Sequence, residues 1–210
     1  PVGFIEAGLD ANATKPFPRS CYQKILVASK IKNLPGLTPE QTDLAMMIAM
    51  ESIEAVCGVN FIRDDSRFNE ANIRVTLADL KRGTLGLAAL SMGDCAFPHT
   101  LKMDGSSRRW TMEFAIAVFC HELLHNLGLW HTSTRGQLMF PSTNGSPQSP
   151  QGEDIARLVI LYGESIRKPK APEAPNPATE YSMKVPGGTM LFRPDVNKPP
   201  RPGGGTIWNV

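Results

Sequence analysis

The sequence predicts an α+β fold, with one domain followed by an extended tail. The chain has 210 residues, enough for a domain of roughly 150 to 170 residues with a single core. Strand-like segments come mostly before two helical segments, at 111–128 and 152–163. Nine of the eighteen prolines lie between Pro169 and Pro202, so the composition changes there. The predicted parts are an N-terminal arm (1–20), a domain (21–167) and a Pro/Gly-rich tail (168–210).

The first part of the predicted domain contains a strand, a turn and a helix. Residues 22–31, "YQKILVASKI", are rich in β-branched residues and alternate enough to predict a strand. In the turn that follows, Thr38 can cap a helix, Pro39 suits its first position, and Gln41 completes a capping box. Apolar residues then recur at helical spacing over 41–58, which predicts a helix that ends at a glycine.

The second part of the domain contains further strands and two helices. Gly128 can adopt the left-handed conformation that ends a helix over 111–128. Acidic residues in the first turn of the helix at 152–163 suit the helix dipole. The strands predicted in this part are 72–80, 83–93 and 100–104.

Charge and hydropathy exclude two classes of partner. The chain has 22 basic and 20 acidic residues, and no segment concentrates Lys and Arg as a phosphate-binding surface would. We therefore expect no nucleic acid. No apolar stretch approaches the roughly 18 residues of a spanning helix, and the opening "PVGFIEAGLD" lacks the features of a secretory signal. We expect no membrane partner, and synthesis in the cytosol unless a leader was removed.

The four cysteines are Cys21, Cys57, Cys95 and Cys120. They show no CxxC spacing and are too sparse for a disulfide-rich scaffold. Reduced, mostly buried thiols are the first interpretation, and one disulfide is the second. On a helix, Cys120 points about 100° away from its neighbour His121, which favours a role in the core over metal ligation.

Three of the four histidines lie within "FCHELLHNLGLWH", residues 119–131. Positions i and i+4 share a helix face, so His121 and His125 can direct their imidazoles to one point. Gly128 lets the backbone turn, and His131 can return as a third ligand. Three nitrogens leave one tetrahedral position open, as catalytic zinc sites do. The pattern predicts one catalytic Zn²⁺ held by these three histidines.

The same segment predicts a reaction. A zinc ion lowers the pKa of a bound water to about 7 and polarises a carbonyl group. Glu122 follows the first ligand and can accept the proton of that water and deliver it to a leaving amine. Peptide-bond hydrolysis needs these functions together. The predicted function is a zinc-dependent endopeptidase with a polypeptide substrate and Glu122 as general base and acid.

HExxHxxGxxH followed by a methionine is the signature of the metzincin metallopeptidases, and the chain resembles their matrixin branch, the matrix metalloproteinase-like catalytic domains. Met139 in "QLMFPS" matches the Met-turn residue, "GLAAL" (86–90) resembles the substrate-pairing edge strand, and "EDIARLVILYG" resembles the closing helix. The resemblance covers roughly residues 20–165. It implies the zincin fold, a twisted mixed sheet with an antiparallel edge strand, an active-site helix and a C-terminal helix.

The resemblance also implies where a substrate binds. An extended polypeptide would pair with the edge strand, where the backbone groups of Leu87 and Ala88 would contact it. A side-chain pocket beside the metal would be walled by Phe140, Pro141 and Ser142.

The chain departs from the matrixin pattern at the family's other ions. Ala89 and Lys102 stand where ligands of a structural zinc are expected, and His99 alone cannot hold that ion. Asp94 and Asp104 are isolated candidates for calcium, and we interpret both as turn residues. We expect neither structural zinc nor calcium, so stability must come from packing, a partner or the tails.

Matrixin zymogens keep a cysteine of a propeptide on the zinc. "PRSC", residues 18–21, resembles that element, although the order of its residues differs. A cysteine at the start of a strand is the preferred interpretation of Cys21, and a thiol switch is the minor alternative.

A second function belongs to another class: a structural or docking component of a large assembly, such as a virus particle, with proteolysis retained or lost. Ile207, Trp208 and Val210 follow a flexible "PGGGT" and could anchor the tail to a protein partner. The two functions are compatible. A toxin-like peptidase exported without a signal also fits the domain, but it leaves the tail unexplained.

Overall fold

A computed structural model describes most of the chain, which divides into two compact units, residues 1–167 and 168–210. We describe each unit by itself. Within the first unit the described residues are 4–7, 16–80, 83–91, 93–95, 98–106, 110–142 and 147–165. Within the second they are 181–185 and 188–192, and for these and 4–7 the backbone alone is described.

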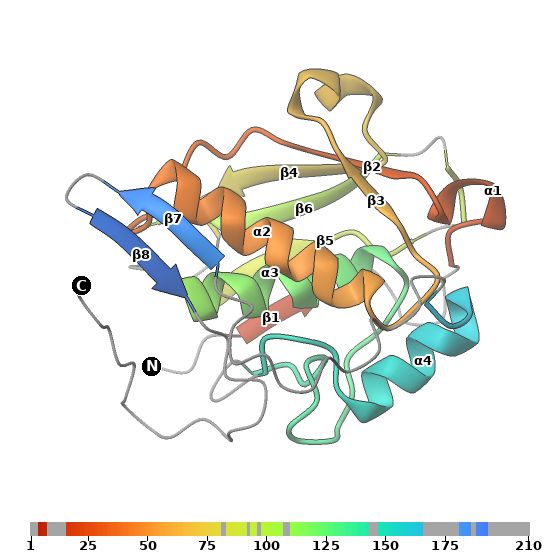
Figure 1. Cartoon of the computed structure of the whole chain (residues 1–210). Helices are drawn as coiled ribbons and strands as arrows, with labels where there is room; N and C mark the ends of the chain where they lie inside the picture. The colour runs from red at the N-terminus through yellow and green to blue at the C-terminus, as the bar shows by residue number, and fades with distance from the viewer. Residues whose placement is uncertain are drawn as a thin grey trace, which may run out of the picture. The chain divides into compact units, whose positions relative to one another are not determined.

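The first unit contains a mixed six-stranded sheet of order β1-β5-β6-β4-β2-β3 (Figure 1). The β5–β6 pair is antiparallel, and the other pairs are parallel. Strands and helices are combined as expected for the α+β class. The strands are β1 (Phe4–Ala7), β2 (Ile25–Ser29), β3 (Phe61–Arg63), β4 (Ile73–Ala78), β5 (Thr84–Ala88) and β6 (His99–Asp104).

Two long helices build the core beside the sheet. Helix α2 packs against α3, and α3 contacts β5 and β6 (Figure 1). Every residue of α3 from Ala115 to Asn126 is buried. No helix in the described ranges is long and apolar enough to cross a membrane. The helices are α1 (Arg19–Tyr22), α2 (Pro39–Glu54), α3 (Met112–Asn126), α4 (Gly152–Tyr162) and the 3-10 helix η2 (Asp65–Glu70).

Helix α2 begins with the predicted capping box. The Thr38 hydroxyl accepts a hydrogen bond from the Gln41 amide at 3.2 Å, and the Gln41 side chain accepts one from the Thr38 amide at 2.9 Å. The helix ends at Glu54, earlier than predicted. The buried carboxylate of Glu54 accepts a hydrogen bond from the Phe61 amide at 2.6 Å, which links the helix end to β3. With three residues, β3 is too short to give a periodic signal in the sequence.

Strand β5 is antiparallel to β6, as the matrixin resemblance implies, but it does not form the edge of the sheet. Strand β1 pairs with it in parallel on the outer side. The arm predicted at 1–20 therefore includes a sheet strand. The expectation of a free edge at 86–90 is wrong for this structure because the chain's own N-terminal segment covers it.

The second unit contains an antiparallel hairpin of β7 (Tyr181–Val185) and β8 (Gly188–Phe192). Proline and glycine dominate the composition of this unit, so an extended tail was predicted and the hairpin was missed. Consecutive residue pairs run from Tyr181↔Phe192 to Val185↔Gly188. The proposed anchor residues Ile207, Trp208 and Val210 lie outside the described residues.

A disulfide joins Cys21 of α1 to Cys95, with their Cα atoms 5.9 Å apart. The first interpretation of four reduced thiols is wrong for this pair, and the second interpretation, one disulfide, is correct. A thiol in a disulfide cannot ligate a metal, which rules out the thiol switch for Cys21 in this form. The other two cysteines are free and buried, and burial raises the pKa of Cys57 to about 11 and of Cys120 to about 12.

We expect the disulfide to stabilise the first unit because it joins positions 74 residues apart. Replacing Cys21→Ser and Cys95→Ser together should lower the free energy of unfolding by about 2 to 4 kcal/mol. Urea unfolding of the oxidised protein and the double variant measures this difference. Reductant should destabilise the parent and leave the variant unchanged; equal midpoints for parent and variant would contradict the prediction.

Candidate metal centre

The C-terminal half of α3 and the turn after it place three histidines together. The Thr111 hydroxyl caps the helix by accepting a hydrogen bond from the Phe114 amide at 3.3 Å. His121 and His125 lie one turn apart on one helix face. Gly128 then adopts a φ of 93°, which strains any residue with a Cβ atom, and the backbone turns so that His131 approaches the first two.

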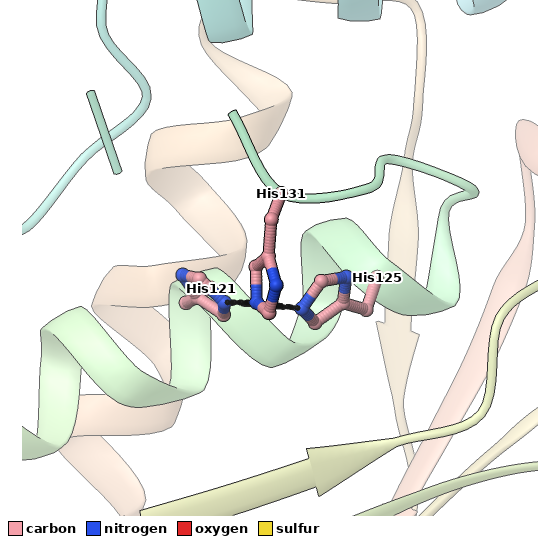
Figure 2. A group of neighbouring side chains, drawn as sticks. All are labelled: His121, His125 and His131. Carbon is pink, nitrogen blue, oxygen red and sulfur yellow. Dashed lines mark hydrogen bonds between the residues drawn. The ribbon is translucent and has the colours of Figure 1, made fainter. Parts of the chain in front are cut away.

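The three rings direct their Nε2 atoms to one point (Figure 2). The Nε2 atoms of His121 and His125 are 3.0 Å apart, and that of His131 is 3.2 Å from each. In the described part of the chain these three form the one group of three or more His, Cys, Asp or Glu side chains close enough to hold a metal ion.

Backbone carbonyl groups fix the protonation of two of these rings. Nδ1 of His121 lies 2.7 Å from the carbonyl oxygen of Leu138, and Nδ1 of His125 lies 2.7 Å from that of Leu129. A carbonyl oxygen can only accept, so each Nδ1 carries the proton and donates it. The Nε2 atoms of His121 and His125 therefore present lone pairs to each other. His131 can donate a hydrogen bond to only one of these two atoms. Such convergence suits a cation.

Burial keeps the three imidazoles neutral. Desolvation lowers the pKa of His121 to about 3 and that of the partly buried His131 to about 4. The pKa of His125 is also well below its usual range, first because of burial and then because of the neighbouring histidines. Neutral imidazole is the form that binds a metal ion, so the group is ready to bind one near pH 7.

The nitrogen separations fit a single transition-metal ion. Zinc–nitrogen bonds of about 2.0 to 2.1 Å at tetrahedral angles place two ligand nitrogens about 3.3 Å apart. The observed separations of 3.0 to 3.2 Å are close to this value. The three histidines can therefore bind a metal ion, and three protein ligands leave a position for a water or a substrate.

Glu122 is a buried carboxyl group beside this cluster in sequence. It is fully buried, and no described protein group donates a hydrogen bond to either of its oxygens. Burial raises its pKa well above the usual range. Its side chain lies against Gly86 of β5, where an added Cβ would come within 2.6 Å of the Glu122 Cγ and 2.7 Å of its Cδ. A glycine is therefore needed at this point of the strand.

Asp154 in the first turn of α4 holds the segment that follows His131. Its carboxylate accepts hydrogen bonds from the amides of Leu138 at 2.7 Å, Met139 at 3.3 Å and Gln151 at 3.0 Å. The carbonyl of Leu138 is the group that orients His121. Asp154 thus fixes the position of His121 through the backbone.

This role of Asp154 was not predicted, because the acidic residues of the helix were interpreted through the helix dipole alone. The buried residues of α4 are Asp154, Leu158 and Tyr162, spaced four apart. An aspartate in line with the apolar stripe of an amphipathic helix indicates a buried carboxylate with a specific partner. That signal was available in the sequence.

The residues predicted to contact a substrate lie in two places. Leu87 and Ala88 are in β5, the strand whose Gly86 contacts Glu122. Phe140, Pro141 and Ser142 directly follow Met139 and are all partly buried. The Met139 side chain is fully buried, and its carbonyl accepts a hydrogen bond from the Thr132 amide at 3.0 Å.

An amide side chain connects α3 to the segment around Ala89 and Lys102, where no structural zinc is expected. Asn126 donates hydrogen bonds to the carbonyl of Ala89 at 2.7 Å and to that of Thr100 at 3.1 Å, which joins α3 to the sheet. His99 is buried and makes an edge contact with Phe17, with ring centroids 4.7 Å apart.

The two candidate calcium residues lie in different surroundings. Asp104 accepts hydrogen bonds from the amide and hydroxyl of Ser106, as a turn residue does. Asp94 is exposed to solvent.

Comparison with known proteins finds a distant similarity to a matrix metalloproteinase. Matrix metalloproteinase-18 of Xenopus laevis is 28% identical over 176 aligned residues, which cover 75% of this chain. The match spans 37% of that relative's length. No protein-family model matches the chain. The chain is thus distantly similar to a matrix metalloproteinase, and it carries a group of three histidines that could bind a metal ion.

We expect Asp154→Asn to weaken metal binding without a change in any ligand. The new amide places an N–H group against backbone N–H donors, so at least one buried donor loses its partner. The free energy of unfolding should fall by about 1 to 3 kcal/mol, and zinc affinity by about 10- to 100-fold. Competition with a chelator measures the affinity.

Glu113→Gln, an exposed change in the first turn of α3, is the matched control. It should leave zinc affinity unchanged. Equal affinities in the Asp154 variant and the parent would show that the Leu138 carbonyl keeps its place without the carboxylate.

Proposed function

We propose that the chain is a zinc-dependent endopeptidase of the matrixin branch of the metzincins. The observation that carries this proposal is the convergence of three neutral imidazole nitrogens within 3.0 to 3.2 Å of one another, next in sequence to a buried carboxyl group without a hydrogen-bond donor. The distant similarity to a matrix metalloproteinase supports the same assignment. His121, His125 and His131 would hold one catalytic Zn²⁺.

The residues have distinct roles in the proposed reaction. A zinc ion held by the histidines would lower the pKa of a water molecule and polarise the substrate carbonyl. Glu122 accepts a proton from the attacking water and delivers it to the leaving amine. The carbonyls of Leu138 and Leu129 keep the ligand rings in place.

We infer that a polypeptide substrate would bind along the side of β5 on which β1 lies in this structure. The strand passes Glu122 at Gly86, so an extended peptide paired with Leu87 and Ala88 would bring a peptide bond near the carboxyl group. Phe140, Pro141 and Ser142 would line the side-chain pocket, and Met139 would be the Met-turn residue.

Replacing Glu122→Gln tests the role of the acid and base. The amide cannot accept the water proton, so we expect kcat on a peptide library to fall by about 10² to 10⁴. Zinc content, measured by metal analysis, should stay near one per chain. Glu113→Gln serves as the control and should cleave as the parent does.

Removal of zinc by a chelator should abolish cleavage in the parent, and re-addition should restore it. Equal cleavage by the parent and the Glu122 variant would contradict the mechanism.

Replacing Gly86→Ala tests the close approach of β5 to Glu122. The added Cβ would overlap the Glu122 side chain and displace the carboxyl group. A displacement of about 1 Å can cost about 100-fold in rate, so kcat/KM should fall by that order. Gly152→Ala is the matched control, since nothing lies within 4 Å of the Cβ it adds. Similar kcat/KM values for the two variants would show that the contact is unimportant.

A further inference from the structure

We propose that residues 4–7 occupy, within the same chain, the peptide-binding edge of β5, so that a polypeptide can bind there only after this strand has left. The inference rests on the proposed function for the part that β5 plays in substrate binding. It assigns an occupant to that surface, namely the chain's own N-terminal strand β1.

The register places β1 on the residues that a substrate would need. A β-strand has two sides, and one side of β5 already pairs with β6. The other side pairs with β1, and no third strand can bind to β5 while β1 is present. The partners on this side are Phe4↔Thr84, Glu6↔Leu87 and Ala7↔Ala88. Leu87 and Ala88 are the two residues expected to pair with a substrate.

The strand also passes the acid and base. The register between β1 and β5 shifts between Phe4 and Glu6, which places Leu85 and Gly86 of β5 opposite the irregularity. Gly86 is the residue that lies against Glu122. In addition, β1 contacts α3, the helix that carries this carboxyl group. Strand β1 therefore lies beside the reacting part of the proposed site.

Two residues that follow β1 in the sequence, Phe17 and Cys21, are attached to the rest of the first unit. Phe17 is buried, and its amide donates a hydrogen bond to the Tyr162 hydroxyl at 3.0 Å. That hydroxyl donates in turn to the Leu127 carbonyl at 2.6 Å, at the end of α3. Cys21 is fixed by its disulfide to Cys95. The strand is thus connected through residues 8–15 to an anchored point.

A short connection makes the strand a strong competitor. A segment of the same chain can reach local concentrations on the order of millimolar, so even weak pairing occupies the edge against a micromolar peptide. The pairing is also reversible in principle, because β1 has four residues and its register is interrupted. The fraction of chains with an open edge then sets the apparent affinity for any peptide.

A binding experiment tests the occupant without reference to catalysis. The probe is a fluorescent peptide with the sequence of residues 1–10, PVGFIEAGLD. The probe is titrated against the full chain and against a chain that lacks residues 1–15 but keeps Phe17 and Cys21. Both proteins carry Glu122→Gln and are loaded with zinc. We expect the truncated chain to bind the probe at least tenfold more tightly, and a scrambled peptide to bind neither.

A second variant guards against misfolding of the truncated chain. The double change Ile5→Pro and Glu6→Pro keeps the full length, and successive N–H groups of a strand point to opposite sides, so one change must remove an N–H that faces β5. This variant should bind the probe as the truncated chain does. Equal probe binding by the full chain and both variants, or no binding by either variant, overturns the proposal.

Kinetics separate this proposal from the proposed function. With Glu122 intact, the truncated chain should show a KM for a peptide substrate at least fivefold lower than the full chain, with kcat little changed. An unchanged KM in a chain that cleaves overturns the proposal. If no chain cleaves any peptide, the endopeptidase assignment fails, and the probe titration still decides whether β1 occupies the edge.

Discussion

The arrangement of the site depends on two hydrogen bonds from imidazole to backbone carbonyl. By fixing the proton on Nδ1 of His121 and of His125, the carbonyls of Leu138 and Leu129 turn both Nε2 lone pairs toward each other. Two lone pairs 3.0 Å apart repel unless a cation lies between them. The fold supplies the energy for this placement through the burial of α3 and through Asp154, which holds the Leu138 segment.

Local rules in the sequence predicted a large part of this arrangement. The capping box at Thr38, the helix spacing of His121 and His125, and the turn at Gly128 follow from backbone geometry over a few residues. Two of the features that were missed depend on residues far apart in the sequence. The disulfide requires Cys21 and Cys95 to meet across 74 residues, and the pairing of β1 with β5 involves segments about as distant.

The same structure suggests how the domain is held together around the site. Asn126 joins α3 to the carbonyls of Ala89 and Thr100, beside the strands where a matrixin would place a structural ion. A neutral amide makes such a bridge at a modest net gain, about 1 kcal/mol per hydrogen bond. The disulfide contributes more, because it restricts the unfolded chain. The disulfide and the Asn126 hydrogen bonds thus connect parts of the first unit whose sequence offers few ligands for a structural metal ion.

The dependence of His121 on Asp154 has a consequence for the order of assembly during translation. The ribosome synthesises residues 121–131, which contain the three histidines, before it synthesises α4. Domains acquire their tertiary contacts as the chain emerges. Until α4 docks, the Leu138 carbonyl lacks the support that orients the first imidazole. The nascent chain would therefore carry all three ligands in an imprecise arrangement. The close approach of the three imidazoles would arise only after α4 has been synthesised and has folded onto the rest of the first unit.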